Sequence, residues 1–360
     1  MAAAARLDAA APPWHPFGAM RPTLHPRLLN GRGGDPGLYV EAMHLSDAVL
    51  FDCGDLSALA PRHLLRVGLL GISHAHMDHW ADFDRLLRVL VGRARRLPVV
   101  GPEGFAQRLF HRLQSYTWNL ADRIRDDLVL EAIEVTGTAA GAAWPRTRLR
   151  LHSGFRPEPL PPLVPATPDG TVLHLGRLRL RAAVLDHGTP CLGFALEEAE
   201  HVNVWRSRLE ERGLPVGPWL AGLKAAVAEG CPDDHPVAVF ARASEAAGAP
   251  VRPLGTLRDL VSVTPGQRLA YLTDFADTPA NRAAAVALAR RADILFIEAP
   301  FLAEDAAIAA ERRHLTTRAA GEIAREAGVR RLEPFHFSPR YPGGEGRLLA
   351  EVAAAASRTA

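Results

Sequence analysis

Residues 71–80 read Gly71-Ile72-Ser73-His74-Ala75-His76-Met77-Asp78-His79-Trp80 and contain an H-x-H-x-D-H pattern. The residues just before it, 67–72, carry no polar side chain, which predicts a strand buried on both faces. After it, apolar residues between Trp80 and Arg95 recur at steps of three and four, as on the apolar face of a helix. The pattern therefore lies where a buried strand turns into a helix.

The residue types in this pattern are those of a metal site. On an extended segment His74 and His76 point the same way, while Asp78 and His79 fall where the chain enters the helix. Imidazole and carboxylate ligands suit Zn²⁺ first and also Fe or Mn. Because no cysteine is among the candidate ligands, a closed structural zinc site is disfavoured.

Three further candidate ligands follow predicted strands elsewhere in the chain: His187, Asp274 and His336. Together with the pattern they complete the ligand count of a pair of ions. His74, His76 and His187 would hold one ion. Asp78, His79 and His336 would hold the second. Asp274 would bridge the two, which leaves an open position for a water between the ions.

The order and spacing of these segments resemble the metallo-β-lactamase superfamily, with Asp52 in LFDCG as a further match, and the C-terminal half resembles ribonuclease Z. The matching stretches are LDHGTPCLGFAL from Leu185, GPWLAGLK from Gly217, RLAYLTDFAD from Arg268, EAPF from Glu298, HLTTRAAGEIAREAG from His314 and HFSPRY from His336.

This resemblance implies a four-layer αββα sandwich, two Zn²⁺ ions and phosphodiester cleavage that generates the 3′ end of precursor tRNA. The family's metal ligands match His74, His76, Asp78, His79, His187, Asp274 and His336, and its additional histidine matches His314. The family is often dimeric, so the resemblance also implies a homodimer.

The family also carries a flexible arm whose Gly-Pro-rich tip grips the elbow of the tRNA, and Gly213 to Pro218 occupies the corresponding place here. Two features depart from the family. The arm has few basic residues, chiefly Arg206, Arg208, Arg212 and Lys224. The usual opening strand with its Leu-Gly-Thr turn and Pro-containing loop is absent, and PRLLNGRGGDPGLYV, from Pro26, stands in its position.

We expect a disordered tail over residues 1–25 and one metallo-β-lactamase-like domain over 26–360, with the arm inserted at about 197–266. That insertion shows two helical patches and no clear strand. Pro102 is expected to open a helix that runs to about Arg125. Residues 137–170, rich in Pro, Gly and Ala, are expected to be irregular apart from one strand at 148–152.

Composition sets broad limits. The chain has 360 residues, 48% hydrophobic, and only 3 cysteines, which indicates an ordinary globular protein without a disulfide framework. Its net charge of +2 does not indicate a strongly basic nucleic-acid binder. No run approaches the roughly 18 apolar residues that a membrane span needs. We therefore expect a cytoplasmic protein with no membrane association.

The expected roles follow from this chemistry. Asp78 would orient the attacking water and take its proton, and His314 would protonate the leaving oxygen. Asp52 would orient a ligand imidazole rather than bind metal. Ser338 and Arg340, just past His336, would hold a substrate phosphate, although surface salt bridging explains Arg340 equally well.

Three function classes remain open from the sequence. The first is a binuclear metal-dependent phosphodiesterase of the ribonuclease Z type, acting on RNA or on a smaller phosphodiester. The second is a hydrolase of the same fold that acts on a lactone, a thioester or a β-lactam, or an iron enzyme acting on persulfides. The third is a non-catalytic binding protein. His314 favours the first class, because an alkoxide leaving group needs a proton donor. The filled ligand set disfavours the third.

Overall fold

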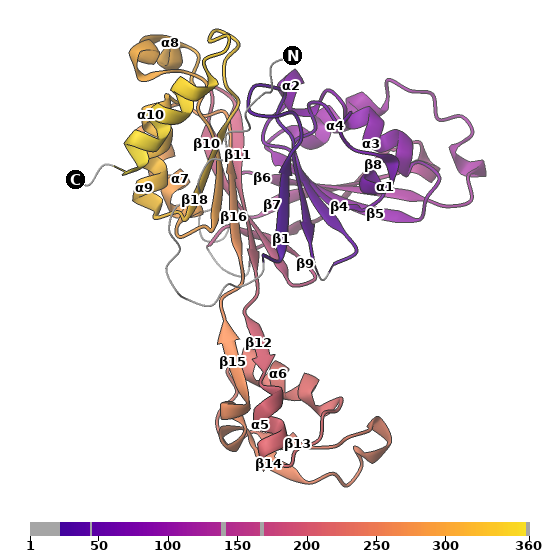
Figure 1. The fold of residues 1–360 in the computed structure, drawn as a ribbon. Coiled ribbons are helices and arrows are strands. Elements are labelled where there is room, and N and C mark those ends of the chain that lie inside the picture. The colour runs from indigo at the N-terminus through magenta and orange to yellow at the C-terminus, as the bar shows by residue number, and fades with distance from the viewer. Residues whose placement is uncertain (1–21, 44, 138–141, 166–168, 358–360) are drawn as a thin grey trace, which may run out of the picture.

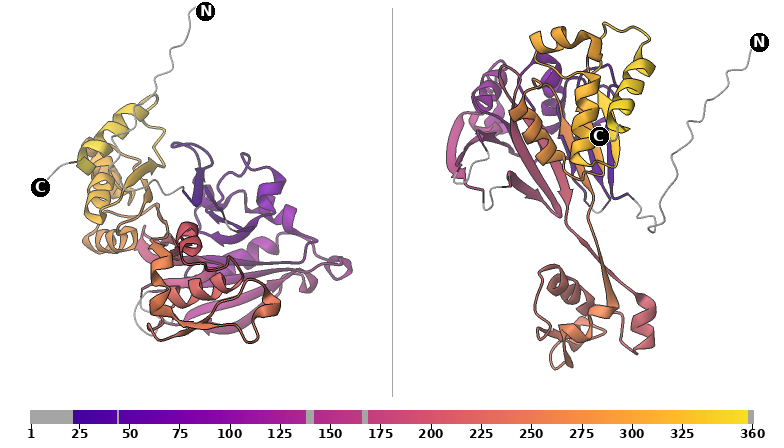
Figure 2. Two further views of the ribbon diagram at one scale, coloured as in Figure 1. Left: turned by 60° about the horizontal axis from the view of Figure 1, so that its bottom comes forward. Right: turned by 90° about the vertical axis from the view of Figure 1, so that its left-hand side faces the viewer.

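Two β-sheets packed face to face form the body of the molecule, and helices cover the outer face of each (Figures 1 and 2). The computed structural model describes residues 22–43, 45–137, 142–165 and 169–357. The order of the layers is helix, sheet, sheet, helix. This confirms the αββα sandwich expected from the sequence.

The first sheet is built by the N-terminal half of the chain and follows the chain order from β1 to β8. Its central strands β3 to β6 are parallel, and antiparallel strands flank them on both sides. The strands are β1 (Leu24–Leu28), β2 (Leu38–Ala42), β3 (Ala48–Phe51), β4 (Val67–Gly71), β5 (Arg95–Pro102), β6 (Leu128–Val135), β7 (Trp144–Arg150) and β8 (Pro157–Leu163).

The second sheet has the order β18-β17-β16-β11-β10-β9, with β16, β17 and β18 parallel to one another. Its strands are β9 (Thr171–Leu175), β10 (Leu178–Asp186), β11 (Pro190–Glu198), β16 (Arg268–Leu272), β17 (Ile294–Glu298) and β18 (Arg331–Phe335). Because parallel strands end at the same edge, the loops after β16 and β18 lie at one edge of the sheet, on either side of the end of β17.

The outer helices shield one face of each sheet. The first sheet is covered by α1 (Pro61–Leu64), α3 (Phe83–Leu90) and α4 (Phe105–Leu113), the second by α7 (Pro279–Ala289), α9 (Thr317–Ala327) and α10 (Glu345–Ser357). The short helices α2 (Met77–Trp80) and α8 (Ala306–Glu311) lie at the end of the sheets that is uppermost in Figure 1. In α3 the residues Phe83, Leu86, Leu87 and Leu90 are buried, which is the apolar face predicted from their spacing. Among the described residues, no helix has the length and apolar character required to cross a membrane.

A hydrophobic core fills the space between the two sheets. There Phe51 of β3 stacks on Phe194 of β11 and on Tyr271 of β16, with ring centroids 5.0 and 5.7 Å apart. Tyr271 in turn stacks on Phe335 of β18 at 5.3 Å. This aromatic column joins the two sheets directly beneath the edge where their strands end.

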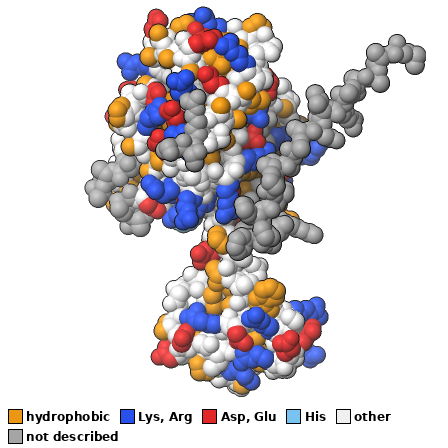
Figure 3. All heavy atoms as spheres, turned by 60° about the vertical axis from the view of Figure 1, so that its left-hand side comes forward, with side chains coloured by type: hydrophobic (Ala, Val, Ile, Leu, Met, Phe, Trp, Pro, Cys, Tyr) orange, Lys and Arg blue, Asp and Glu red, His pale blue; other side chains and the backbone are white. Residues whose placement is uncertain are grey.

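The arm, residues 201–264, projects from the body on the two-stranded stalk β12 (His201–Val204) and β15 (Val261–Thr264) (Figure 1). Beyond the stalk lie α5 (Arg206–Glu211), α6 (Trp219–Ala228), β13 (Pro236–Ala238) and β14 (Val251–Pro253). The arm has an apolar core of its own, formed by residues such as Leu209, Trp219 and Leu257. Acidic and basic side chains lie side by side on its surface (Figure 3).

Trp219→Ala is expected to unfold the arm and leave the body folded. Trp219 is 2% exposed in the arm core, so its removal should cost about 3–5 kcal/mol. Hydrogen exchange should accelerate across 205–260 and stay unchanged in β5 and β16. The matched control is Trp205→Ala, because Trp205 is 49% exposed. Faster exchange throughout the chain would show that the arm is not a separate cooperative unit.

Two local expectations were wrong. The helix expected from Pro102 to Arg125 begins at Phe105 and ends at Leu113, since Pro102 still belongs to β5 and the indole of Trp118 donates a hydrogen bond to the Leu113 carbonyl. The described part of residues 137–170 holds two strands, β7 and β8, rather than one. The proline-rich β8 is an edge strand, the one place in a sheet where missing N–H donors are tolerated.

The insertion also contains strands that the sequence did not indicate, namely β12 to β15. At the N-terminus, residues 1–21 of the predicted tail lie outside the described residues. From Thr23 onward the chain is part of the fold, because the Thr23 backbone N–H donates to the Gln267 side chain and Leu24 is buried in β1.

Candidate metal centre

The predicted ligands converge at one edge of the two sheets. His74 and His76 follow β4, and Asp78 and His79 lie in α2 directly after them. The remaining three come from the second sheet: His187 lies in the turn between β10 and β11, Asp274 follows β16 and His336 follows β18. The structure thus brings together all seven residues, whose role as ligands stays a prediction.

Four of these residues form the first metal group: His74, His76, His187 and Asp274. Their ligand-capable atoms all lie within 4.8 Å of one another. The Nε2 atoms of His74 and His187 are each 3.7 Å from Asp274 Oδ2.

Asp78, His79 and His336 form the second metal group, again within 4.8 Å. The Asp78 Oδ2 atom lies 3.5 Å from the Nε2 atoms of both His79 and His336. Asp274 Oδ2 is 3.3 Å from His79 Nε2, so this one oxygen faces both groups. A carboxylate in that position could serve as a ligand shared by two cations.

Buried carboxylate and carbonyl groups fix the orientation of the imidazoles. His79 Nδ1 donates to Asp52 Oδ2 at 2.9 Å, and His187 Nδ1 donates to the Arg313 carbonyl at 2.8 Å. Each bond places a ring proton on Nδ1 and leaves Nε2 directed into the cluster. Asp52 is held in turn by the Ser73 backbone N–H and by the buried hydroxyl of Tyr271. The sequence did not point to Tyr271.

Backbone strain gathers at the same edge. Asp52, Asp274, Arg313 and His336 have φ angles of 53°, 47°, 58° and 60°, a left-handed conformation that non-glycine residues rarely adopt. Each costs on the order of 1 kcal/mol and is held only because the surroundings determine it. In Asp52, Asp274 and His336 the turn comes directly after a strand and aims the side chain into the cluster.

The electrostatics of the cluster favour cation binding. Burial and the neighbouring His79 lower the pKa of His74 to about 2, so His74 is neutral. Burial opposes charge on His79 as well, but Asp274 and Asp52 outweigh it and raise the pKa of His79 to about 10. The proton thereby held between carboxylates is one that a metal ion would replace.

An unpaired nitrogen provides a direct test of fit. Within the described chain, His74 Nε2 is buried and has no hydrogen-bond partner. Leaving a buried polar atom unpaired costs about 1–3 kcal/mol, and coordination of a cation would remove that cost. The donor set of imidazole and carboxylate matches Zn²⁺, Fe or Mn.

Glu298 is a site residue that the sequence analysis quoted but gave no role. It ends β17 and is fully buried, and it accepts a hydrogen bond from His314 Nδ1 at 2.7 Å. It also accepts from the backbone N–H groups of Phe275 and Leu315. The His314 ring lies 4.8 Å from the ring of His187, measured between centroids, at the edge of the first metal group. Glu298 could have been identified from its place at the end of a predicted strand, because the two neighbouring strands are also followed by candidate ligands.

Ser338 and Arg340 have contacts that lead away from the cluster. The Ser338 backbone N–H donates to the Pro300 carbonyl, and the Arg340 Nε atom lies 3.4 Å from Asp305 Oδ2. Both residues lie within four positions of His336, and their role in substrate binding stays a prediction.

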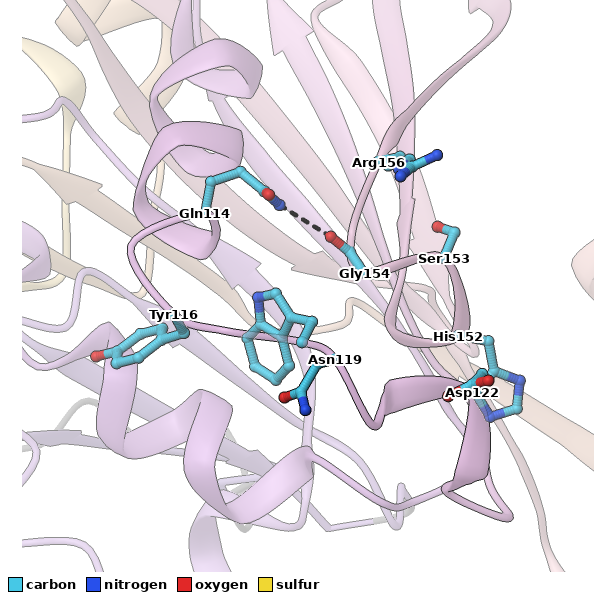
Figure 4. A pocket seen from close by; sticks show the side chains of 9 residues that line it. Gln114, Tyr116, Asn119, Asp122, His152, Ser153, Gly154 and Arg156 are labelled. Atoms are coloured by element: carbon cyan, nitrogen blue, oxygen red, sulfur yellow. Dashed lines mark hydrogen bonds between the residues drawn. The ribbon is translucent and has the colours of Figure 1, made fainter.

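A hollow of about 490 Å³ lies elsewhere, between the C-terminal end of α4 and the turn at residues 151–153 (Figure 4). Tyr116, Asn119, His152 and Arg156 are among its lining residues. None of the nine lining residues belongs to either metal group, so the hollow is separate from the metal centre.

Comparison with known proteins agrees with this geometry. The family model of the beta-lactamase superfamily domain matches residues 234–337. The ribonuclease Z of Deinococcus radiodurans is 35% identical over 311 residues, which cover 85% of this chain and 87% of that protein. The chain belongs to the ribonuclease Z family.

Other comparisons are consistent with ribonuclease Z membership. The ribonuclease Z of Thermobifida fusca is 38% identical over 236 residues, covering 64% of this chain and 66% of that protein. Among solved structures, the metallo-β-lactamase fold protein YhfI from Bacillus subtilis has a TM-score of 0.50 at 15% identity and covers 92% of each chain. That likeness concerns the fold alone.

Proposed function

We propose that this ribonuclease Z family member is a binuclear zinc-dependent endoribonuclease that cleaves a phosphodiester bond at the 3′ end of precursor tRNA. The observation that carries the proposal is the position of Asp274 Oδ2, 3.7 Å from His74 Nε2 in the first metal group and 3.3 Å from His79 Nε2 in the second, beside the Glu298–His314 pair. The identity to named ribonucleases Z supports the reaction class.

The ligands are assigned by group. His74, His76 and His187 would hold one ion, Asp78, His79 and His336 the other, and Asp274 both. When bound, two divalent cations acidify a shared water and offset the negative charge of the phosphate.

Asp78 is suited to orienting the attacking water. Its side chain is 42% exposed, more than that of the other ligands in its group, so it borders the open side of the centre. Burial opposes ionisation, but the hydrogen bond from His336 and the charge of His79 lower the pKa of Asp78 to about 2. The carboxylate is therefore ionised at neutral pH and available as a hydrogen-bond acceptor.

His314 is suited to protonating the leaving oxygen. Burial alone would lower the pKa of His314, but the Glu298 carboxylate outweighs it and raises that pKa above its usual value. Because Nδ1 is used in the bond to Glu298, the proton on Nε2 remains for the substrate.

Side-by-side assays would test the proposal. The purified protein should contain two zinc ions per chain and cleave both a precursor tRNA and bis-p-nitrophenyl phosphate, and a chelator should abolish both activities. A lactone and a thioester serve as the alternative substrates. Turnover of either one without phosphodiester cleavage would overturn the proposed reaction. Homodimer formation and a cytoplasmic location stay predictions for this chain.

Removing the arm should affect the activities on the two phosphodiester substrates differently. Asn203 pairs with Ser262 across the stalk, so a short Gly-Ser linker can replace residues 203–262 with little change to the body. We expect kcat/KM on bis-p-nitrophenyl phosphate to stay within about twofold and kcat/KM on precursor tRNA to fall more than about tenfold, mainly through KM, since the lost contacts are binding contacts. Equal loss on both substrates would mean that the arm is only structural.

A further inference from the structure

The loop between β1 and β2, residues 29–37, crosses from the first sheet to the end of β18 in the second. This is the segment whose sequence departs from the family's usual opening. Arg32 makes the crossing: its guanidinium donates to the Pro334 carbonyl at 2.5 Å and to Glu333 Oε2 at 2.7 Å. Its backbone carbonyl accepts a hydrogen bond from the Phe337 N–H at 2.8 Å.

These three bonds lie on both sides of His336. Pro334 and Glu333 precede this ligand and Phe337 follows it, while His336 itself has a left-handed φ of 60°. The Arg32–Glu333 pair is largely shielded, with side chains 26% and 16% exposed. Arg32 therefore fixes the strained turn that directs His336 into the second metal group.

The same loop also packs beside Asp78. A Cβ atom added to Gly54 would lie 1.8 Å from the Asp78 carbonyl oxygen and 2.6 Å from Asp35 Cβ, so Gly54 packs tightly between the loop and the Asp78 backbone. The Asn30 amide holds the loop by donating to the carbonyls of Asp35 and Asp55, at 2.7 and 2.9 Å. The loop thus contacts the chain around His336 directly and the backbone of Asp78 through Gly54.

The first metal group has its own link between the sheets. The Leu192 N–H of β11 donates to the Ser73 carbonyl at 2.8 Å, directly before His74 and near His187. That link does not involve Arg32. A change at Arg32 should consequently disturb the second metal group more than the first.

We infer that Arg32 is a positioning residue that sets the distance between His336 and Asp78, and through it the affinity of the second metal group. The inference rests on the metal centre assigned under the proposed function.

Metal titration of the wild type and four variants tests it. The metal-free full chain, as wild type, Arg32→Ala, Arg32→Lys and Arg331→Ala, is titrated with Zn²⁺ against a chromophoric chelator. Asp78→Asn identifies which of the two affinities belongs to the second metal group. Arg331→Ala is the matched control, because Arg331 also bonds to Glu333 but from an exposed position.

For Arg32→Ala we expect the affinity of the second metal group to fall about tenfold, a size typical of an outer contact's effect on a metal site. The affinity of the first should change less, because among the described residues only the contact of His336 Nδ1 with Asp274 Oδ1, 2.8 Å apart, links it to the moved ligand. The affinity of the second metal group in Arg32→Lys should lie between those of wild type and Arg32→Ala, since lysine keeps the charge but not the fork of donors. Arg331→Ala should match wild type. The melting temperature of metal-free Arg32→Ala should equal that of Arg331→Ala.

Other results overturn the inference. Wild-type affinities in Arg32→Ala, or a parallel fall of both affinities and of the melting temperature, would assign Arg32 a merely structural role. If Arg32→Ala does not fold, the Arg32→Lys affinities decide by the same criteria. A wild-type chain that binds fewer than two ions would instead refute the metal centre itself.

Discussion

Asp274→Asn is expected to release metal and to lower phosphodiester turnover by more than about a thousandfold. Asp274 Oδ2 faces both metal groups, at 3.3 Å from His79 Nε2 and 3.7 Å from His74 Nε2. The amide has the same shape but no charge, so it supplies neither the shared ligand nor the negative charge that offsets two cations. Loss of a single well-placed charge-stabilising group already costs about a hundred- to a thousandfold, and here one change affects both ions.

The measurements are metal content by atomic absorption and the rate on bis-p-nitrophenyl phosphate. Asp277→Asn is the matched control, since Asp277 pairs with Arg282 at the start of α7. It should keep two ions and the wild-type rate. If Asp274→Asn kept full zinc and full rate, the assigned ligand set would be refuted.

His314→Ala is expected to keep both ions and to slow the chemical step. General acid catalysis contributes about a hundred- to ten-thousandfold, and the full effect should appear on an RNA substrate, whose leaving oxygen is a poor leaving group. The loss on bis-p-nitrophenyl phosphate should be smaller, because p-nitrophenolate needs less protonation. An unchanged kcat on both substrates would remove His314 from the mechanism.

The pH dependence of the rate tests whether His314 acts in its protonated form. The reaction needs the protonated form of His314, so the rate should fall as pH rises through its pKa. Glu298 raises that pKa against the effect of burial. Glu298→Gln should therefore move the alkaline limb of the profile to lower pH. The matched control is Glu304→Gln, an exposed residue paired with Arg347, which should leave the limb in place. If the alkaline limb did not move in Glu298→Gln, Glu298 would not be the residue that raises the pKa of His314.

Much of the fold could be read from local patterns. The all-apolar stretch at 67–72 became the buried strand β4, and the spacing of Phe83, Leu86, Leu87 and Leu90 became the buried face of α3. The strand β8 could not be read this way, because four of its seven residues are proline and only an edge position makes it a strand. That position is a property of the assembled sheet.

The residues of the candidate metal centre were found from the sequence because each has a local signature. Four of them form the H-x-H-x-D-H pattern between a strand and a helix, and His187, Asp274 and His336 are ligand-type side chains at the ends of predicted strands. Glu298 has the same signature but gained no role, since its partner His314 is sixteen residues away and its meaning depends on their contact.

The sequence by itself determined individual strands and helices, such as β4 and α3, and the residue types of the candidate metal centre, because hydrophobic period and ligand spacing are local properties of the chain. Only the tertiary structure decided which contacts support them. Arg32 lies some 300 positions from Pro334 and Tyr271 lies 219 from Asp52. Such pairs form when two independently patterned sheets pack together, and no period within either half encodes which side chains then meet.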